Sequence, residues 1–228
     1  MASVKYWCPS AMNKTTCLWA LACVLVATQA SADSLDTLAQ FLKTTHSGKA
    51  DFKQVVSSPN KAGQGARSKS SSGTFAFVRP HQFRFDYQKP FAQTIVADGQ
   101  TLWLYDVDLA QVSARKQAQT LGTTPAALIA TATDVAALQK DFTLQAQPDA
   151  EGLQWVQATP KNKDSTLSEV RVGLRVEDTR VTLSKLDIAD AMGQRSLITF
   201  ERFESNPAAL PMSLFQFVPP KGVDVVRP

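Results

Sequence analysis

The sequence offers almost no cysteine to a folded domain. All three cysteines, Cys8, Cys17 and Cys23, lie within the first 32 of its 228 residues. If those residues are removed on export, as the segment itself suggests, the remaining chain has no thiol, no disulfide and no cysteine ligand for a metal. Its stability must then come from a hydrophobic core.

Catalytic and metal-binding signatures are also missing. The only two histidines, His46 and His81, lie far apart in the sequence, and no cysteine is available to complete a zinc site with them. We find no nucleophile elbow, HExxH motif or phosphate loop. Asp106 and Asp108 are interpreted as turn residues rather than as a catalytic carboxylate pair. We therefore expect neither an enzyme nor a cofactor.

The chain has no strong excess of one charge. It contains 24 lysines and arginines against 20 acidic residues, and removal of the first 32 residues takes away only Lys5 and Lys14. Basic and acidic residues are mixed along the sequence, whereas nucleic-acid binding requires a concentrated cationic face. We expect no nucleic-acid partner.

The most apolar run, Cys17–Ala27, is too short to span a bilayer, which takes roughly 20 residues. Lys5 and Lys14 precede this run, and the small residues Ala30–Ala32 follow it. This order is typical of a cleaved secretory signal. We expect residues 1–32 to be the signal peptide and residues 33–228 to form a single domain that begins at Asp33.

Two details of the signal segment stay open or are disfavoured. Met12 would open a more compact signal, so either Met1 or Met12 can be the true start. Lipid attachment at Cys23 is disfavoured because Leu21 lies one position too close to that cysteine. No linker or internal repeat divides the rest of the chain.

The most informative segment of the chain is rich in aromatic residues. Phe83, Phe85 and Tyr87 recur at every second position, so their rings share one face of a strand while Arg84 and Asp86 point to the other. A little further on, Asp98-Gly99 separates two apolar runs and predicts a type I′ hairpin turn. This part of the chain is predicted to be a β-meander.

The rest of the chain is predicted to be mainly β as well. A helix is expected over Ser34–Thr45, and Ser57–Ser72 is expected to be a long polar loop. Eleven segments are predicted as strands: Phe52–Val56, Thr74–Val78, Phe83–Tyr87, Gln93–Ala97, Thr101–Tyr105, Gln111–Arg115, Phe142–Gln147, Leu153–Thr159, Val170–Val176, Val181–Ile188 and Ser196–Phe203. A twisted sheet of this width curls, which predicts an incomplete, half-open antiparallel β-barrel over a hydrophobic cavity that side chains or a ligand must fill.

Two short helices are expected to interrupt the strands. Thr124-Pro125 begins one that continues through Ala126–Ala130, and Asp134–Lys140 forms the other. Their small side chains would pack loosely on aromatic rings, which suits a lid, although a fixed plug at the barrel mouth fits the pattern equally well. Alternation does not decide which face of the sheet Trp103 occupies.

Several separated motifs carry a family resemblance. Arg79-Pro80, Phe83–Phe85, Ile95–Gly99 and Leu102–Asp106 occur in that order, followed by Gly122–Pro125 and by Phe217–Asp224 near the end. This pattern resembles the LolA family of periplasmic lipoprotein carriers. The resemblance covers most of the chain after the signal.

The resemblance implies an incomplete β-barrel closed by helices in the periplasm of a Gram-negative bacterium. Such a monomeric carrier receives outer-membrane lipoproteins from an inner-membrane lipoprotein-releasing ABC transporter. It shields their acyl chains in its hydrophobic cavity and delivers them to the outer-membrane receptor lipoprotein LolB. Neither the number of acyl chains, the docking surface nor the identity of the cargo follows from the sequence.

The resemblance also assigns roles to single residues. Arg79 matches the lid-closing arginine, which bonds backbone carbonyls of the lid helices. Phe83, Phe85, Leu128 and Ile129 match positions that line the lipid-binding cavity. Phe85 is a departure, because many members have tryptophan there.

Two other functions remain open at this point. An enzyme on the same fold could orient a small aromatic substrate in the cavity, because fold does not fix function. A periplasmic lipid-binding sensor or structural module could instead bind an apolar segment of another protein.

Overall fold

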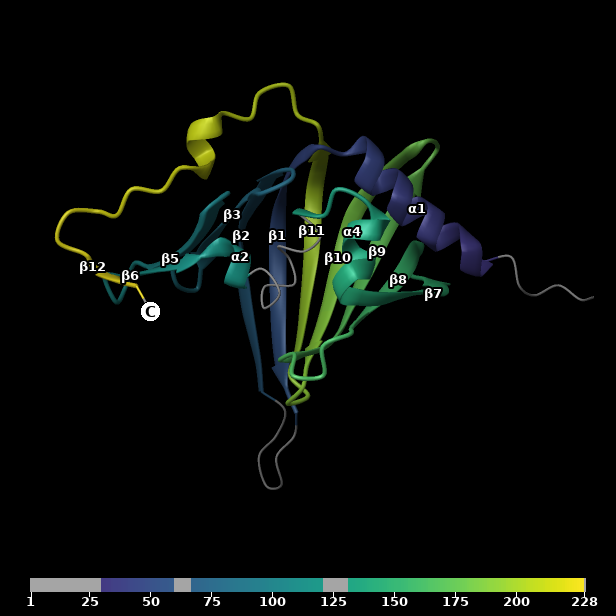
Figure 1. Cartoon of the computed structure of the whole chain (residues 1–228), viewed down its shortest axis with the longest axis horizontal. Helices are drawn as coiled ribbons and strands as arrows, with labels where there is room; N and C mark the ends of the chain where they lie inside the picture. The colour runs from purple at the N-terminus through teal and green to yellow at the C-terminus, as the bar shows by residue number, and fades with distance from the viewer. Residues whose placement is uncertain (1–29, 60–66, 121–130, 228) are drawn as a thin grey trace, which may run out of the picture.

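The computed structural model describes residues 30–59, 67–120 and 131–227 (Figure 1). Its dominant feature is a single sheet of twelve strands in the order β12-β6-β5-β4-β3-β2-β1-β11-β10-β9-β8-β7. The strands are β1 Ser47–Ser58, β2 Arg67–Val78, β3 Gln82–Lys89, β4 Gln93–Asp98, β5 Thr101–Asp106, β6 Gln111–Lys116, β7 Phe142–Ala150, β8 Leu153–Pro160, β9 Leu167–Glu177, β10 Arg180–Asp190, β11 Arg195–Ser205 and β12 Asp224–Val226. The chain is therefore mainly β, as predicted.

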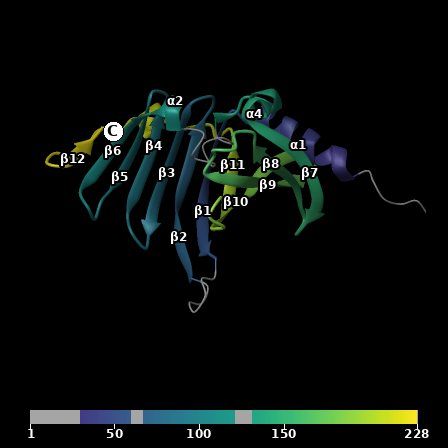
Figure 2. The ribbon, with the colours of Figure 1, turned by 60° about the horizontal axis from the view of Figure 1, so that its bottom comes forward.

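The sheet is curved but open (Figure 2). Strands β7 and β12 form its two edges and do not pair with each other. All neighbouring strands are antiparallel except β12, which runs parallel to β6. The half-open barrel is confirmed. The short strand β12 is the one strand that the sequence did not predict.

The central pairing of the sheet joins distant parts of the chain. Strand β1 lies between β2 and β11, so residues near the two ends of the domain become neighbours. The side chain of Gln54 donates to that of Ser196 at 2.6 Å, across 142 residues of sequence. The pairing of β1 with β11 unites two local meanders, β1–β6 and β7–β11, in one sheet.

Helix α1, Ala30–Thr44, covers the inner, concave face over β7 to β10. Its apolar side chains Leu38, Phe41 and Leu42 are buried, as the helical spacing predicted. Helix α4, Val135–Asp141, lies beside α1 and β7, and the Asp134 carboxylate caps it by accepting from Ala137 N at 2.7 Å. The predicted helix at 134–140 is thus confirmed, whereas the predicted helix at 125–130 lies outside the described residues.

The core of the inner face is built from aromatic rings on neighbouring strands. Phe75 and Phe85 are cross-strand partners whose ring centroids lie 4.4 Å apart. Phe52 of β1 meets the edges of Phe85 and Tyr87 at 5.4 and 4.9 Å. Such rings contribute large buried areas and favourable edge-to-face contacts. The two-residue spacing in the sequence therefore placed these side chains on the correct common face.

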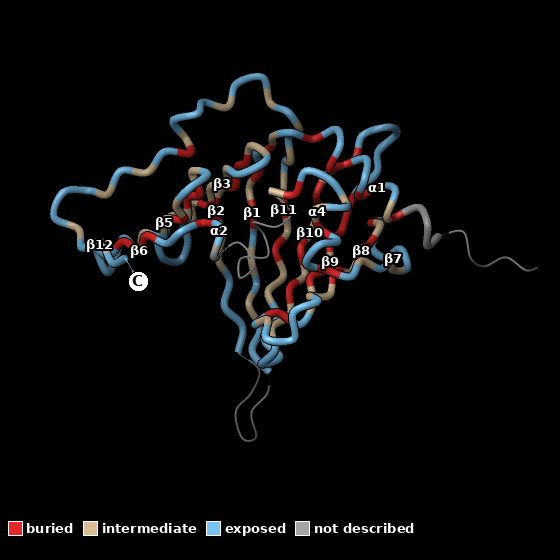
Figure 3. Tube along the Cα trace, viewed as in Figure 1, coloured by how far each residue is buried: buried red, intermediate tan, exposed pale blue. Residues whose placement is uncertain are grey.

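The predicted loop at Ser57–Ser72 is wrong at both of its ends, residues 57–58 and 67–72, while residues 60–66 lie outside the described residues. Strand β1 continues to Ser58 and β2 begins at Arg67, with pairs such as Val56↔Lys69 and Ser57↔Ser68. The ends of both strands are exposed beyond the core (Figure 3). Residues 57–58 and 67–72 are all serine, lysine or arginine, so backbone ladder bonds hold this part of the hairpin together and hydrophobic periodicity could not reveal it.

The turn between β4 and β5 also differs from the prediction. The hairpin exists, but its two-residue turn is Gly99-Gln100, and only Gly99 has a positive φ, of 106°. A type I′ turn would need two such residues. Asp98 ends β4, and its carboxylate accepts from Gln100 N at 2.8 Å and Thr101 N at 2.7 Å. Burial alone would raise the pKa of Asp98, but these bonds and one from Trp103 lower it.

The C-terminal segment, residues 206–223, runs over the outer, convex face. Its short 3₁₀ helix η2, Met212–Phe215, lies against β3 and β4, and Phe215 is fully buried. The ring of Phe217 lies 5.5 Å from that of Trp103, which resolves the orientation of Trp103 as outward. Among the described residues, no helix combines the length and apolar character needed to cross a membrane.

Candidate functional site

An apolar pocket of about 240 Å³ lies on the inner face of the sheet. One wall comes from Phe85, Tyr87 and Ile95 on β3 and β4. The facing wall comes from the other half of the sheet, with Leu167, Ile188 and Ile198 on β9, β10 and β11. Polar side chains close one end of the pocket: Gln54, Asp190, Gln194 and Ser196.

A wider depression of about 790 Å³ adjoins this pocket. The two share Gln54 and Tyr87 in their walls. Phe91 and Leu109, from the turns that follow β3 and β5, also line the depression, and each is 70% exposed. The inner face is therefore accessible from the end of the sheet where these two turns lie.

The helix-covered part of the inner face is packed more tightly. Between Leu38 of α1, Leu138 of α4 and the sheet there is a void of only about 10 Å³, lined by apolar atoms alone. A void of this size does not hold a ligand. Within the part of the chain that the structure describes, the larger apolar pocket on the inner face thus lies beside α1 and α4.

Tyr87 brings the only phenolic hydroxyl to the pocket walls. Burial raises its pKa from 10.0 to about 12. The phenol therefore stays neutral over the whole physiological range. It adds a large amphipathic ring to the wall but no charge.

Arg79 lies just beyond the end of β2, next to the end of α1. Its Nη1 donates a hydrogen bond to the carbonyl oxygen of Thr45, the residue after α1. The guanidinium carbon lies 5.1 Å from the ring centroid of Phe41 and 5.0 Å from that of Phe77. Burial lowers the pKa of Arg79 to about 10, so the side chain remains charged at neutral pH. The arginine thus links helix α1 to the sheet.

The structure places the other predicted site residues as follows. Phe83 and Phe85 are neighbours, with ring centroids 6.2 Å apart, but only Phe85 reaches the pocket while Phe83 is fully buried in the core. Leu128 and Ile129 lie outside the described residues. Sequence reasoning missed the facing wall, although Ile188 alternates with the buried Leu186 on β10, and Ile198 alternates with the buried Phe200 on β11.

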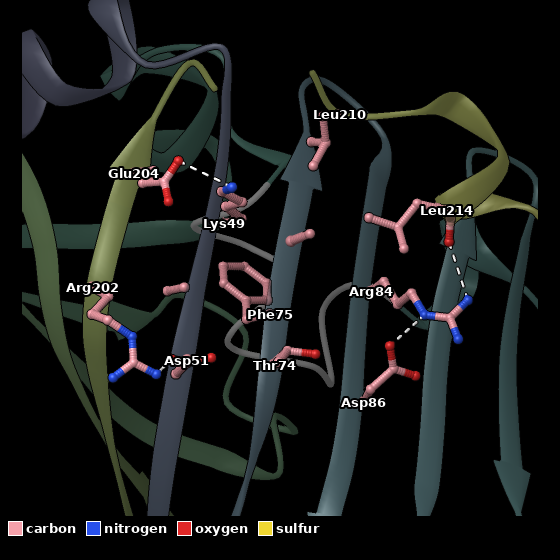
Figure 4. Close-up of a pocket in the computed structure, with 12 residues that line it drawn as sticks. Lys49, Asp51, Thr74, Phe75, Arg84, Asp86, Arg202, Glu204, Leu210 and Leu214 are labelled. Carbon is pink, nitrogen blue, oxygen red and sulfur yellow. Dashed lines mark hydrogen bonds and ion pairs between the residues drawn. The ribbon is translucent and has the colours of Figure 1, made fainter. Parts of the chain in front are cut away.

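A second pocket, of about 350 Å³, lies on the outer face beneath the C-terminal segment (Figure 4). Its six charged side chains pair with each other: Lys49 with Glu204 at 3.1 Å, Arg84 with Asp86 at 2.6 Å, and Arg202 with Asp51. Leu210 and Leu214 lie over them, and the Leu214 carbonyl accepts from Arg84 at 3.1 Å. Two of these pairs join β1 to β11 and the third lies within β3, and together the six charges balance.

No cluster that could hold a metal ion occurs in the described parts of the chain. An open sheet with an aromatic inner face, a solvent-accessible apolar pocket and a covering helix defines a half-barrel of the kind that holds apolar ligands. The family model "Outer membrane lipoprotein carrier protein LolA" matches residues 43–218. The chain belongs to this family.

Sequence relatives agree with the family model. An outer-membrane lipoprotein carrier protein of Albidiferax ferrireducens is 60% identical over 198 residues, which cover 87% of this chain and 92% of that protein. One of Methylibium petroleiphilum is 48% identical over 209 residues, covering 92% and 97%.

One solved structure supports the fold alone. An uncharacterized conserved protein of Thermus thermophilus matches with a TM-score of 0.51 at 13% identity, covering 86% of this chain and 98% of that one.

Proposed function

We propose that this chain is a periplasmic carrier that shields the acyl chains of outer-membrane lipoproteins. The observation that carries the proposal is the accessible apolar pocket between Phe85 and Ile198 in a chain that belongs to the LolA family. Its relatives are outer-membrane lipoprotein carrier proteins, which points to the same cargo. We find no observation that favours an enzyme or a sensor over this function.

The physical need for such a carrier is large. Holding a saturated chain of about 16 carbons in water costs roughly 12 kcal/mol, at about 0.8 kcal/mol per methylene. Transfer from a bilayer to a protein pocket gains little, because both are apolar. A carrier of this kind must therefore bind its cargo weakly enough to release it, and a closed empty state that competes with cargo lowers the affinity.

The assignment of single residues is part of the proposal. Phe85 lines the pocket and Phe83 packs next to it in the core, and by the family resemblance we assign both, with Leu128 and Ile129, to the acyl-binding wall. Arg79 acts as a latch that stabilises the closed empty state. Its bond to Thr45 and its contacts with two rings support this role. An arginine suits the task because its planar guanidinium offers several donors and stays charged.

The proposal includes the route of the protein. The signal at residues 1–32 is removed, and residues 33–228 work in the periplasm as a monomer of one domain, without a cofactor. An inner-membrane ABC transporter loads the carrier, and the outer-membrane receptor lipoprotein LolB unloads it.

A fluorescent fatty-acyl probe tests the pocket directly. Ser196 lines the pocket, and Thr199 lies on the same strand with the opposite orientation. We expect wild type to bind the probe, Ser196→Trp to weaken binding about tenfold or more by filling the pocket, and Thr199→Trp to bind like wild type. Equal binding by both variants would place the probe elsewhere and contradict the assigned pocket.

The cargo is tested by incubating the mature protein with spheroplasts. We expect a one-to-one complex with a lipoprotein in the supernatant. A protein that binds the probe but releases no lipoprotein would be a lipid-binding module of another kind, and the carrier proposal would fail.

A further inference from the structure

The junction between α1 and β1 is very short. Only Thr45 and His46 separate the end of the helix at Thr44 from the start of the strand at Ser47. Thr45 supplies the carbonyl that accepts from Arg79. The position of this carbonyl therefore depends on whatever holds these few residues in place.

Asn206 holds this junction from the far end of the chain. It follows the last residue of β11 and has a φ of 50°, a left-handed conformation that asparagine tolerates well. Its side-chain oxygen accepts from His46 N at 2.8 Å and from Ser47 N at 3.1 Å. Its side-chain nitrogen donates to the Thr44 carbonyl at 2.7 Å. Both ends of one amide are thus used on the same four-residue segment.

Arg79 and Asn206 divide the junction carbonyls between them. The backbone N–H of Asn206 donates to Ser47 O at 2.8 Å, and the backbone N–H of Arg79 donates to His46 O at 2.8 Å. With the two side-chain bonds, the carbonyls of residues 44 and 47 bond to Asn206, and those of residues 45 and 46 bond to Arg79. The two residues therefore form a single clamp on the junction.

Aromatic packing leaves this region little freedom. The ring of Phe203, three residues before Asn206, lies 6.1 Å from that of Phe41 and 6.4 Å from that of Phe77. These are the two rings that flank the Arg79 guanidinium. Asn206 and Arg79 thus bond to the same segment, next to one packed aromatic cluster.

We propose that Asn206 is a positioning residue for the Arg79 latch: it fixes the Thr45 carbonyl where Arg79 can bond it. This inference rests on the proposed function, in which the latch stabilises the closed empty state. Without the Asn206 side chain the junction moves and the bond from Arg79 to the Thr45 carbonyl weakens. The closed empty state then opens more easily. Cargo should then bind more tightly, because less free energy is spent on opening.

Asn206→Gly is the sharpest variant. Glycine adopts the same positive φ without strain, so the substitution removes only the side-chain bonds. Asp178→Gly is the matched control, since Asp178 is exposed, has a φ of 54° and lies in the turn between β9 and β10. We expect Asn206→Gly to lower the Kd for the fatty-acyl probe about fivefold. Asp178→Gly should leave the Kd unchanged.

A double variant separates positioning from general stability. If Asn206 acts through Arg79, Asn206→Gly combined with Arg79→Leu should bind the probe as Arg79→Leu does alone, within about twofold. Amide hydrogen exchange at His46 and Ser47 should quicken in Asn206→Gly. Asn206→Asp, which keeps the acceptor and loses the donor, should give an intermediate Kd.

The possible failures are distinguishable. If wild type does not bind the probe, the proposed function falls and this inference falls with it. If wild type binds, but Asn206→Gly matches Asp178→Gly or weakens binding, only the positioning role is overturned. Independent, multiplying effects of the two substitutions in the double variant would overturn it as well.

Discussion

The charged guanidinium of Arg79 is largely buried. Two phenylalanine rings and the carbonyl of Thr45 take the place of water beside it. Burial destabilises the charged form and lowers its pKa to about 10, while the rings and the Thr45 carbonyl compensate in part. Cation–π contacts of this kind contribute about 0.5–2 kcal/mol each. The unfavourable free energy of burying the charge and the favourable free energy of these contacts therefore oppose each other. A small change in either one shifts the balance between closed and open states.

We predict that Arg79→Leu tightens binding of the fatty-acyl probe about tenfold and slows its transfer to acceptor vesicles. The closed state loses its bond to Thr45, whereas the apolar pocket is retained. The effect should be the same at pH 6 and pH 9, because a pKa of about 10 keeps Arg79 protonated at both. Arg175→Leu, on the exposed end of β9, is the control. Equal transfer rates for Arg79→Leu and wild type would refute the latch.

The raised pKa of Tyr87 predicts that the fold loses stability at alkaline pH. In the unfolded chain a tyrosine ionises near pH 10, but in the folded protein Tyr87 holds its proton up to about pH 12. Between these values the unfolded state has lost a proton that the folded state keeps, so stability falls as pH rises. We expect Tyr87→Phe to lose about 1 kcal/mol less than wild type between pH 9 and pH 11, measured by urea unfolding. The same loss in both proteins would contradict the assignment.

Close strand approach explains why glycine occupies position 73. A Cβ placed on Gly73 would lie 1.8 Å from the backbone oxygen of Asp86 in β3, and backbone cannot yield cheaply. We predict that Gly73→Ala destabilises the protein by about 2–3 kcal/mol in urea unfolding. Ser72→Ala, one residue earlier in β2, should change stability by less than about 0.5 kcal/mol. A neutral Gly73→Ala would mean that β2 and β3 separate easily.

The elements that the sequence predicted are those whose side chains face a core. The alternation at Phe83, Phe85 and Tyr87, and the helical spacing in α1, report burial directly. The polar extension of β1 and β2 and the three-residue β12 depend on backbone pairing. Such pairing produces no periodic pattern of apolar residues in the sequence. Trp103 could not be oriented because its neighbours are apolar too.

Contacts between distant residues were beyond the reach of sequence patterns as well. Asn206 bonds to residues about 160 positions earlier, and no local sequence motif indicates such a partner. Alternation could have placed Ile188 and Ile198 on the inner face, but it could not show that they lie opposite Phe85. Periodicity placed Phe85 on the apolar face of its strand, whereas Arg79 was singled out only by the family resemblance.

At the scale of the whole molecule, the two faces of the sheet serve different purposes. The inner face holds the apolar pocket, and the outer face carries paired charges and the C-terminal segment. Alternate residues of the same strands build both. A substitution at a single position therefore affects one face while leaving the other in place.

Phe215 is predicted to attach the C-terminal segment to the outer face. It is fully buried, whereas its neighbour Met212 is 54% exposed. We expect Phe215→Ala to raise the rate of proteolysis within residues 206–223 about tenfold or more, with the sheet still folded by circular dichroism. Met212→Ala should be cleaved like wild type. Unfolding of the whole sheet in Phe215→Ala would show that the segment is not a separate unit.

The central position of β1 has a consequence for how the chain reaches this shape. Strand β1 is among the first to emerge during synthesis or export, yet one of its two partners, β11, is among the last. Closing so long a loop is slow compared with forming local hairpins. Until β11 has emerged, the aromatic side chains of the nascent chain thus remain partly uncovered. The chain is more prone to aggregate during this interval than after it has folded.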